Sequence, residues 1–395
     1  MKRIYSLIFL IFFTQSLIAS GDKYMLSKLV YDTITKTQLY LDKDKYQEAK
    51  KLLLDLDKSS KVRKKLDKAY LKFYIGYVYS LKDNAAKAII YFKDALGLEG
   101  LPPEQIKSSR LNLVQLYMQQ EDYKQAIYYL DKLIETGPIK AEYYIYKANA
   151  NLSLKKYAIV IKNINEAITF SKEKKTNWLK TKFYCYYILQ DYSNALVTVK
   201  ELIEKEPENK DYWVQLSSLY SILGKSPDAI SSLDVANILK IHLSENELLQ
   251  LISWLRYMHV PHKAATIMLG AIENKTIKAN DKNIESLGDL YYESKEFDKA
   301  IKFYLEVAKK SQSGKMYFKV SQIYSNMHKD KEAINNIKLS LKKHDSINIG
   351  EKKLLLAKSY YELGMIKEAK EFFVEVLKYP KFKKFASAWL EYLKK

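Results

Sequence analysis

Apolar and polar residues do not alternate over extended stretches of this chain, so the sequence predicts helices and no sheet. The most regular feature is a small apolar residue that returns every 33 to 39 residues. This marker residue is alanine in all copies except the fourth, which has valine: Ala49, Ala88, Ala126, Val160, Ala195, Ala229, Ala264, Ala300, Ala333 and Ala369. A spacing near 34 residues is typical of stacked helix pairs.

Other residue types keep fixed distances from the marker residue. Tyrosine stands nine residues earlier in most copies: Tyr40, Tyr79, Tyr117, Tyr186, Tyr220, Tyr291, Tyr324 and Tyr360. A small residue often stands twelve residues earlier, as at Gly76, Ser217 and Gly288. Two helices that cross closely need small residues at the crossing and a large ring beside it. A single pair cannot bury its apolar face, so neighbouring pairs must stack.

These offsets resemble the tetratricopeptide repeat family. The resemblance covers residues 24–380 in ten copies and implies an all-α fold, a right-handed α-α superhelical solenoid of about ten helix pairs. Residues 381–395 are predicted to form one further amphipathic helix, with Phe385, Trp389 and Leu393 on one face and lysines opposite. Such a helix would cap the open end of the stack.

The first 20 residues have a different pattern. Lys2 and Arg3 precede a short apolar run, and small and polar residues follow it. This order predicts a secretory signal peptide at 1–20 that is cleaved near Ser20 or Gly21, and therefore an exported, periplasmic protein. An uncleaved inner-membrane anchor is the alternative. The only cysteine, Cys185, allows no intramolecular disulfide, and we expect it to be a buried packing residue.

The chain has a formal net charge of +20, with lysines spread through every repeat. Export and this even spread argue against nucleic acid as a partner. One interpretation is a solvated convex face, and another is contact with an anionic membrane surface or an acidic polymer.

No catalytic constellation is evident, so we expect a non-enzymatic protein without a cofactor. His259 and His262 form an H-x-x-H pair, but a zinc site would need a further ligand, so we predict exposed turn residues and no metal site.

The repeat frame indicates where a partner would bind. In a solenoid of helix pairs, the first helices line the concave groove, and residues 18, 15, 11 and 8 before the marker should face it. Tyrosine supplies area and a hydroxyl at low entropic cost, which suits recognition of a peptide segment or a partner helix. Packing of these rings against the next repeat is the alternative. The predicted groove residues are Tyr70, Phe73, Tyr77, Gln115, Asn149, Lys180, Tyr184, Tyr187, Arg256, Tyr292 and Phe318.

Three stretches carry a narrower resemblance. They are Leu101-Pro102-Pro103 followed by residues 111–117, Pro261-His262-Lys263-Ala264-Ala265, and Tyr379-Pro380-Lys381 ending in residues 388–392. They are similar to exported tetratricopeptide proteins that accompany TonB/ExbB/ExbD energy-transduction systems of Gram-negative bacteria. The resemblance implies a periplasmic scaffold or adaptor accessory to TonB-dependent outer-membrane transport. The alternative function is an envelope polysaccharide-binding or cell-wall-assembly protein.

Overall fold

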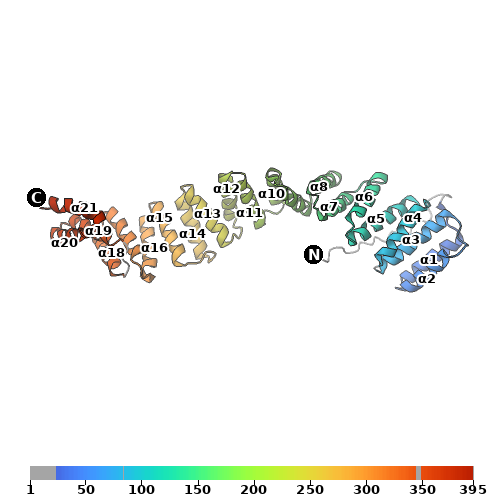
Figure 1. The fold of residues 1–395 in the computed structure, drawn as a ribbon, viewed down its shortest axis with the longest axis horizontal. Helices are drawn as coiled ribbons and strands as arrows, with labels where there is room; N and C mark the ends of the chain where they lie inside the picture. Colours follow the sequence, from blue (N-terminus) through green and yellow to red (C-terminus); the bar gives the residue numbers. More distant parts are fainter. Residues whose placement is uncertain (1–23, 83, 344–347, 395) are drawn as a thin grey trace. The chain divides into compact units, whose positions relative to one another are not determined.

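The computed structural model describes residues 24–82, 84–343 and 348–394. These residues form 21 α-helices and no strand. Figure 1 shows the helices following one another in pairs along the sequence. The first five pairs are α1 (Lys28–Leu41) with α2 (Tyr46–Asp57), α3 (Lys65–Leu81) with α4 (Ala85–Gly97), α5 (Pro103–Gln119) with α6 (Tyr123–Thr136), α7 (Ala141–Ser153) with α8 (Tyr157–Ser171), and α9 (Thr176–Ile188) with α10 (Tyr192–Lys205).

The remaining helices continue the same alternation. They are α11 (Lys210–Ile222) with α12 (Ser226–Ile238), α13 (Glu245–Tyr257) with α14 (Pro261–Glu273), α15 (Asp281–Glu293) with α16 (Phe297–Lys310), α17 (Lys315–Asn326) with α18 (Asp330–Lys342), α19 (Ile349–Glu362) with α20 (Ile366–Val376), and the single helix α21 (Pro380–Tyr392). The predicted all-α fold of about ten helix pairs is confirmed.

The marker residue has the same place in every pair. It is the fourth residue of the second helix, from Ala49 in α2 to Ala369 in α20. Its relative exposure is at most 1 % in all ten copies. A larger side chain at this point would separate the two helices, which explains why the sequence repeats a small residue there.

Close packing at the crossing also explains the small residues twelve positions before the marker. A Cβ atom on Gly288 would lie 2.8 Å from the ring of Tyr304, and one on Gly76 would lie 3.2 Å from Phe92. Ser217 occupies the same position in its pair and donates a hydrogen bond to the Ala229 carbonyl oxygen, at 2.8 Å. The first helix therefore approaches the second almost backbone to side chain.

The tyrosine nine residues before the marker packs within its own pair. Tyr79 stacks on Tyr91 and Tyr117 stacks on Tyr129, with ring centroids 5.6 and 5.8 Å apart. Tyr291 with Phe303 and Tyr360 with Phe372 repeat this arrangement at 5.6 Å. In each case an aromatic residue three positions after the marker is the partner. The recurring tyrosine is thus a structural part of the pair.

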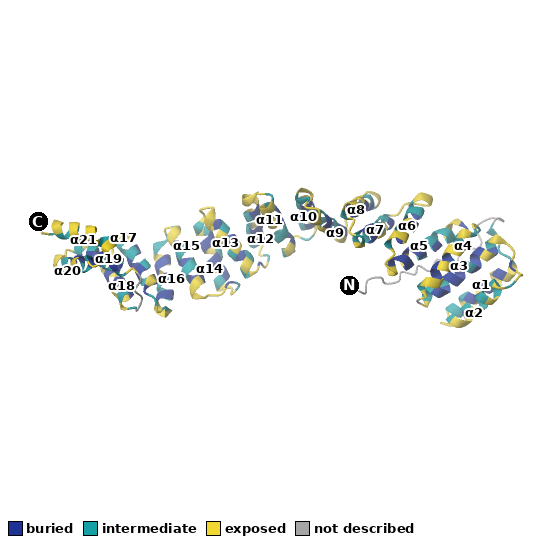
Figure 2. Ribbon diagram, in the orientation of Figure 1, coloured by how far each residue is buried: buried dark blue, intermediate teal, exposed yellow. Residues whose placement is uncertain are grey.

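Contacts divide the chain, which the sequence predicts as a single stack over 24–380, into two compact units. Unit 1 comprises residues 1–205 and ends with α10, and unit 2 comprises residues 206–395. In unit 2, the Trp213 indole N–H donates to the Pro207 carbonyl oxygen at 2.8 Å, which fixes the start of α11. Each unit has its own buried apolar clusters, shown as the dark blue surfaces between helices in Figure 2.

The C-terminal helix α21 begins one residue before the predicted cap. Trp389 and Leu393 pack on the cluster formed by α18 to α20, as expected for a cap. Phe385 differs, because 61 % of it is exposed. The buried face of α21 is centred on Ala386, so Phe385 lies at its solvent edge.

The predicted signal peptide at 1–20 lies outside the described residues. None of the helices within the described ranges combines the length and the apolar character that a membrane crossing requires.

Candidate partner-binding surface

All the predicted groove residues lie on first helices of their pairs, but they differ in burial. Tyr70, Phe73 and Phe318 are 6 %, 2 % and 6 % exposed, so the structure places these rings in the core rather than on an open wall. Phe73 packs edge-on against Phe92 of the partner helix, with centroids 5.7 Å apart. Burial raises the pKa of Tyr70 to about 12, because the phenolate would lose its hydration.

The remaining predicted residues are accessible to different degrees. Tyr77 of α3 and Asn149 of α7 are partly buried. Exposed residues are Gln115 on α5, Lys180, Tyr184 and Tyr187 on α9, Arg256 on α13 and Tyr292 on α15. The structure thus retains an accessible set in each unit, and the two sets differ in chemistry.

In unit 1, α9 presents an exposed tyrosine surface. Tyr184 is 47 % and Tyr187 is 45 % exposed. Tyr184 meets Tyr157 of α8 edge-on at 6.1 Å, and Tyr187 meets Tyr192 of α10 at 5.8 Å. These contacts hold the rings in fixed orientations while leaving much of their area open. Ordered rings lose little further entropy when a ligand covers them.

Three more apolar residues extend this surface, and the sequence prediction did not include them. Ile188 and Leu189 at the end of α9 are 43 % and 45 % exposed, and Tyr146 on α7 is also exposed. We call the residues Tyr146, Tyr184, Tyr187, Ile188 and Leu189 the α9 surface. The run Ile188-Leu189 directly before a turn was the signal in the sequence, because a turn normally carries polar residues there.

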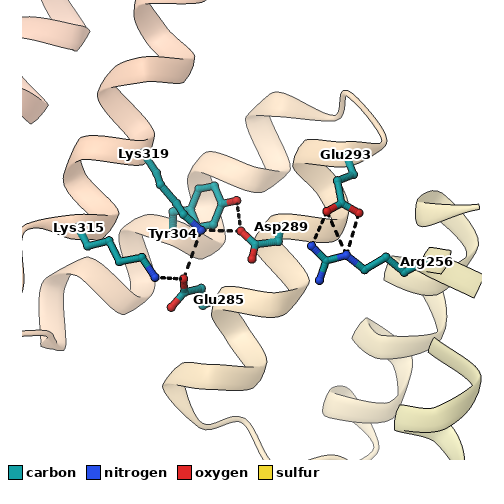
Figure 3. Close-up of polar contacts among 7 residues, drawn as sticks. All are labelled: Arg256, Glu285, Asp289, Glu293, Tyr304, Lys315 and Lys319. Carbon is teal, nitrogen blue, oxygen red and sulfur yellow. Dashed lines mark hydrogen bonds and ion pairs between the residues drawn. The ribbon is translucent and has the colours of Figure 1, made fainter. Parts of the chain in front are cut away.

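In unit 2, the corresponding faces of α13, α15 and α17 carry charged residues that pair with one another (Figure 3). Arg256 of α13 donates from Nε to both carboxylate oxygens of Glu293 on α15, at 3.0 Å. Lys315 and Lys319 of α17 both donate to Glu285 of α15, at 2.8 and 3.2 Å.

The same network includes a buried ring. Lys319 donates to Asp289 at 2.7 Å, and the Tyr304 hydroxyl donates to the same carboxylate oxygen at 2.6 Å. The Lys319 ammonium also lies 4.9 Å from the centroid of the Tyr304 ring. Burial and the bond to Asp289 both raise the pKa of Tyr304. We call this set, comprising Arg256, Glu285, Asp289, Glu293, Lys315 and Lys319, the ion ladder.

The ladder spans successive first helices. Partial burial alone would raise the pKa of Glu285, but hydrogen bonds from Lys315 and Lys319 outweigh burial and lower it. The bond from Glu293 raises the pKa of Arg256. Each charge therefore already has a partner of opposite sign within the protein, and a ligand would have to displace it.

Comparison with known proteins identifies the repeat. Two tetratricopeptide repeat models match residues 111–158 and residues 353–381. The chain contains tetratricopeptide repeats. The first matched segment begins in α5 and ends in α8, and the second covers parts of α19 and α21 and all of α20. No curated protein matches the chain.

Several solved tetratricopeptide repeat structures are distantly similar. One from Parabacteroides merdae is 15 % identical, with 67 % of this chain and 99 % of that chain covered and a TM-score of 0.38. YrrB, described as a TPR protein with an unusual peptide-binding site, is 16 % identical, with 44 % and 88 % covered and a TM-score of 0.34. MamA from Desulfovibrio magneticus is 14 % identical, with 47 % and 99 % covered and a TM-score of 0.37.

The residues considered for other chemistry have structural places in the repeats. Cys185 is fully buried, and burial raises the pKa of its thiol to about 11, which agrees with the predicted packing role. His262 lies in the first turn of α14 and its Nδ1 atom is 2.6 Å from Glu296, whereas His259 is a turn residue with φ of 59°. Within the described ranges, no group of three or more His, Cys, Asp or Glu residues is placed to hold a metal ion.

Proposed function

We propose that this tetratricopeptide repeat protein is a non-enzymatic scaffold that holds a segment of another protein on the first helices of unit 1. The observation that carries the proposal is the α9 surface. It gathers exposed tyrosine and aliphatic side chains on one helix end, and Lys180 lies on the same helix one turn before Tyr184. Clusters of large apolar residues with a polar rim are typical of protein interfaces.

Ligand selection on this surface would rest on rigid rings. Tyr184 and Tyr187 are three residues apart on α9 and each touches a ring of a neighbouring helix. An extended segment that crosses α9 would cover both rings and contact Ile188, while tyrosine hydroxyls remain available to its backbone groups. In unit 2 the ion ladder fills the corresponding positions, so we assign the main contact to unit 1.

The cellular setting follows from the sequence. The charged, apolar and small-residue order of 1–20 supports export, and the resemblance of residues 101–117, 261–265 and 379–392 supports a periplasmic role beside a TonB-dependent transport system. Mass spectrometry of the purified native protein tests export first: a mature N-terminus near residue 21 is expected, and an intact Met1 would contradict cleavage.

Photocrosslinking tests the binding surface. Benzoylphenylalanine placed at Tyr187 is expected to capture a protein partner in cells. The matched control is Tyr128, which is 51 % exposed on the second helix α6. Capture at Tyr128 and not at Tyr187 would contradict the proposal.

A second candidate, binding of an acidic envelope polysaccharide, is favoured by the net charge of +20. Retention on an acidic polysaccharide column that is lost in Tyr184→Ala/Tyr187→Ala, with no protein captured at position 187, would favour this candidate over the first.

A further inference from the structure

A separate pocket lies in unit 2, between the last first helix and the C-terminal helix. Its volume is about 390 Å³, and it is lined by Tyr361 of α19 and by Phe385, Ala388, Trp389 and Tyr392 of α21. Figure 2 shows much of α21 as exposed. The pocket is large enough for one or two side chains of a bound peptide.

Three rings form walls that stand nearly at right angles. Tyr361 meets Trp389 at 4.8 Å and 64°, and Tyr392 meets Trp389 at 5.9 Å and 85°. Trp389 is itself stacked on the buried Phe373, with centroids 5.3 Å apart and planes at 9°. The floor of the pocket is therefore anchored in the core, whereas Phe385 and Tyr392 at its mouth are 61 % and 58 % exposed.

Lysines surround this mouth. Lys358, one turn before Tyr361 on α19, has its ammonium 6.0 Å from the centroid of the Phe385 ring. Lys381 precedes Phe385 by one turn on α21, so it belongs to the same stripe as Phe385 and Tyr392. Lys384 is also exposed beside Phe385. The mouth therefore combines exposed aromatic area with positive charge.

The chemistry of the lining selects among ligands. A cationic ligand would enter an aromatic pocket but would be repelled by Lys358 and Lys381. A sugar needs fixed polar partners for its hydroxyl groups, whereas the lining offers only two hydroxyls, and those of Tyr361 and Tyr392 lie 3.4 Å from each other. An apolar side chain followed by carboxylates satisfies both the rings and the lysines.

We infer that this pocket is a second docking site, for an acidic peptide segment of a partner protein that inserts one aromatic or aliphatic side chain. The inference rests on the proposed scaffold function and adds a second contact point in unit 2. The apolar side chain packs between Tyr361, Trp389 and Tyr392, and carboxylates next to it in the peptide pair with Lys358 and Lys381.

Fluorescence anisotropy with a short labelled peptide, one Phe flanked by Asp and Glu, tests the inference on the full chain. Phe385→Ala is expected to weaken binding by about tenfold, since the ring closes one side of the pocket. Lys381→Glu is expected to weaken it by about threefold at low salt, and less at high salt. Lys383→Glu is the matched control, because Lys383 lies on the opposite face of α21 and should leave binding unchanged.

Fluorine NMR of protein that contains fluorotryptophan locates the peptide. The chain has four tryptophans, and Trp389→Phe assigns the resonance of the pocket. Only this resonance is expected to shift on addition of the peptide. A shift at another tryptophan, equal binding of a peptide with Lys in place of Asp and Glu, or binding of an oligosaccharide in place of the peptide would overturn the inference.

A second copy of the chain is an alternative occupant. Self-association that Phe385→Ala abolishes, without peptide binding, would also overturn the inference. Failure here is distinguishable from failure of the scaffold function. Crosslinking at Tyr187 in unit 1 does not depend on α21, so a partner captured there by a Phe385→Ala protein would leave the scaffold function intact.

Discussion

Helices α9 and α15 occupy the same place in their repeats and use it differently. Counted from the marker residue, Lys180, Tyr184 and Ile188 of α9 correspond to Glu285, Asp289 and Glu293 of α15. The α9 residues face solvent, with Tyr184 47 % exposed. The α15 carboxylates are bound by lysines and arginine of the neighbouring first helices.

One position remains alike in the two helices. Tyr187 of α9 touches Tyr192, and Tyr292 of α15 touches Phe297, with 5.8 Å between centroids in both pairs. The repeat therefore conserves its packing rule within the pair and varies the outer face. The comparison shows that one helix face can either join neighbouring repeats or remain open to a ligand, depending on its charges.

The largest expected effect separates core rings from surface rings within unit 1. Phe73→Ala should lower the free energy of unfolding by about 3–5 kcal/mol, because it leaves a cavity beside Phe92. Tyr187→Ala should change it by less than about 1 kcal/mol, because nearly half of that residue is exposed. Urea unfolding followed by circular dichroism measures both, and equal effects would remove the distinction between core and surface rings.

Helix spacing gives the next effect, in unit 2. Gly288→Ala should destabilise the protein by about 1–3 kcal/mol, because the added methyl would meet the Tyr304 ring at 2.8 Å and disturb the ring that supports Asp289. Gly270→Ala on α14 is the control, since nothing lies within 4 Å of its Cβ, and it should be neutral or stabilising by up to about 1 kcal/mol. A neutral Gly288→Ala would show that the pair is loosely packed.

The ion ladder predicts a smaller, salt-dependent effect. Lys319→Ala should lower the free energy of unfolding by about 1 kcal/mol at low salt and less in concentrated NaCl, because Lys319 bonds to Glu285 and Asp289. Lys331→Ala on the exposed part of α18 is the control. Hydrogen exchange of α15 and α17 should accelerate in the first variant only. Unchanged exchange would mean that the ladder does not join these helices.

The smallest effect concerns pH. Hydrogen bonds from Lys299 and then His262 lower the pKa of Glu296 to about 2, from an ordinary value of 4.5. The depressed pKa means that ionised Glu296 stabilises the fold above about pH 4.5, and that this contribution is lost as pH falls toward 2. Glu296→Gln should therefore reduce the fall in melting temperature across this range. An identical pH profile in the variant would contradict the pairing.

Much of the fold could be predicted from the sequence because the repeat is enforced by close packing. A marker residue such as Ala300 must be small wherever two helices cross, so its spacing counts the pairs. The division after Lys205 could not be predicted, because the repeat spacing continues through it unchanged.

The groove residues were harder to predict, because the repeat frame gives the face of a helix but not the direction of each ring. Phe73 and Phe318 stand 15 residues before their markers and are buried, whereas Lys180 at the same offset is exposed. The apolar type at that offset was the available signal for the core. The charged residues of α15 were visible in the sequence, but their partners lie on helices more than 25 residues away.

Hydrogen exchange of the protein with and without its crosslinked partner tests the central claim most directly. The α9 surface is open and the ion ladder is self-paired, so partner binding should slow exchange in α7 and α9 and leave α13 to α17 unchanged. Protection centred on α13 to α17, with none in α9, would contradict the account.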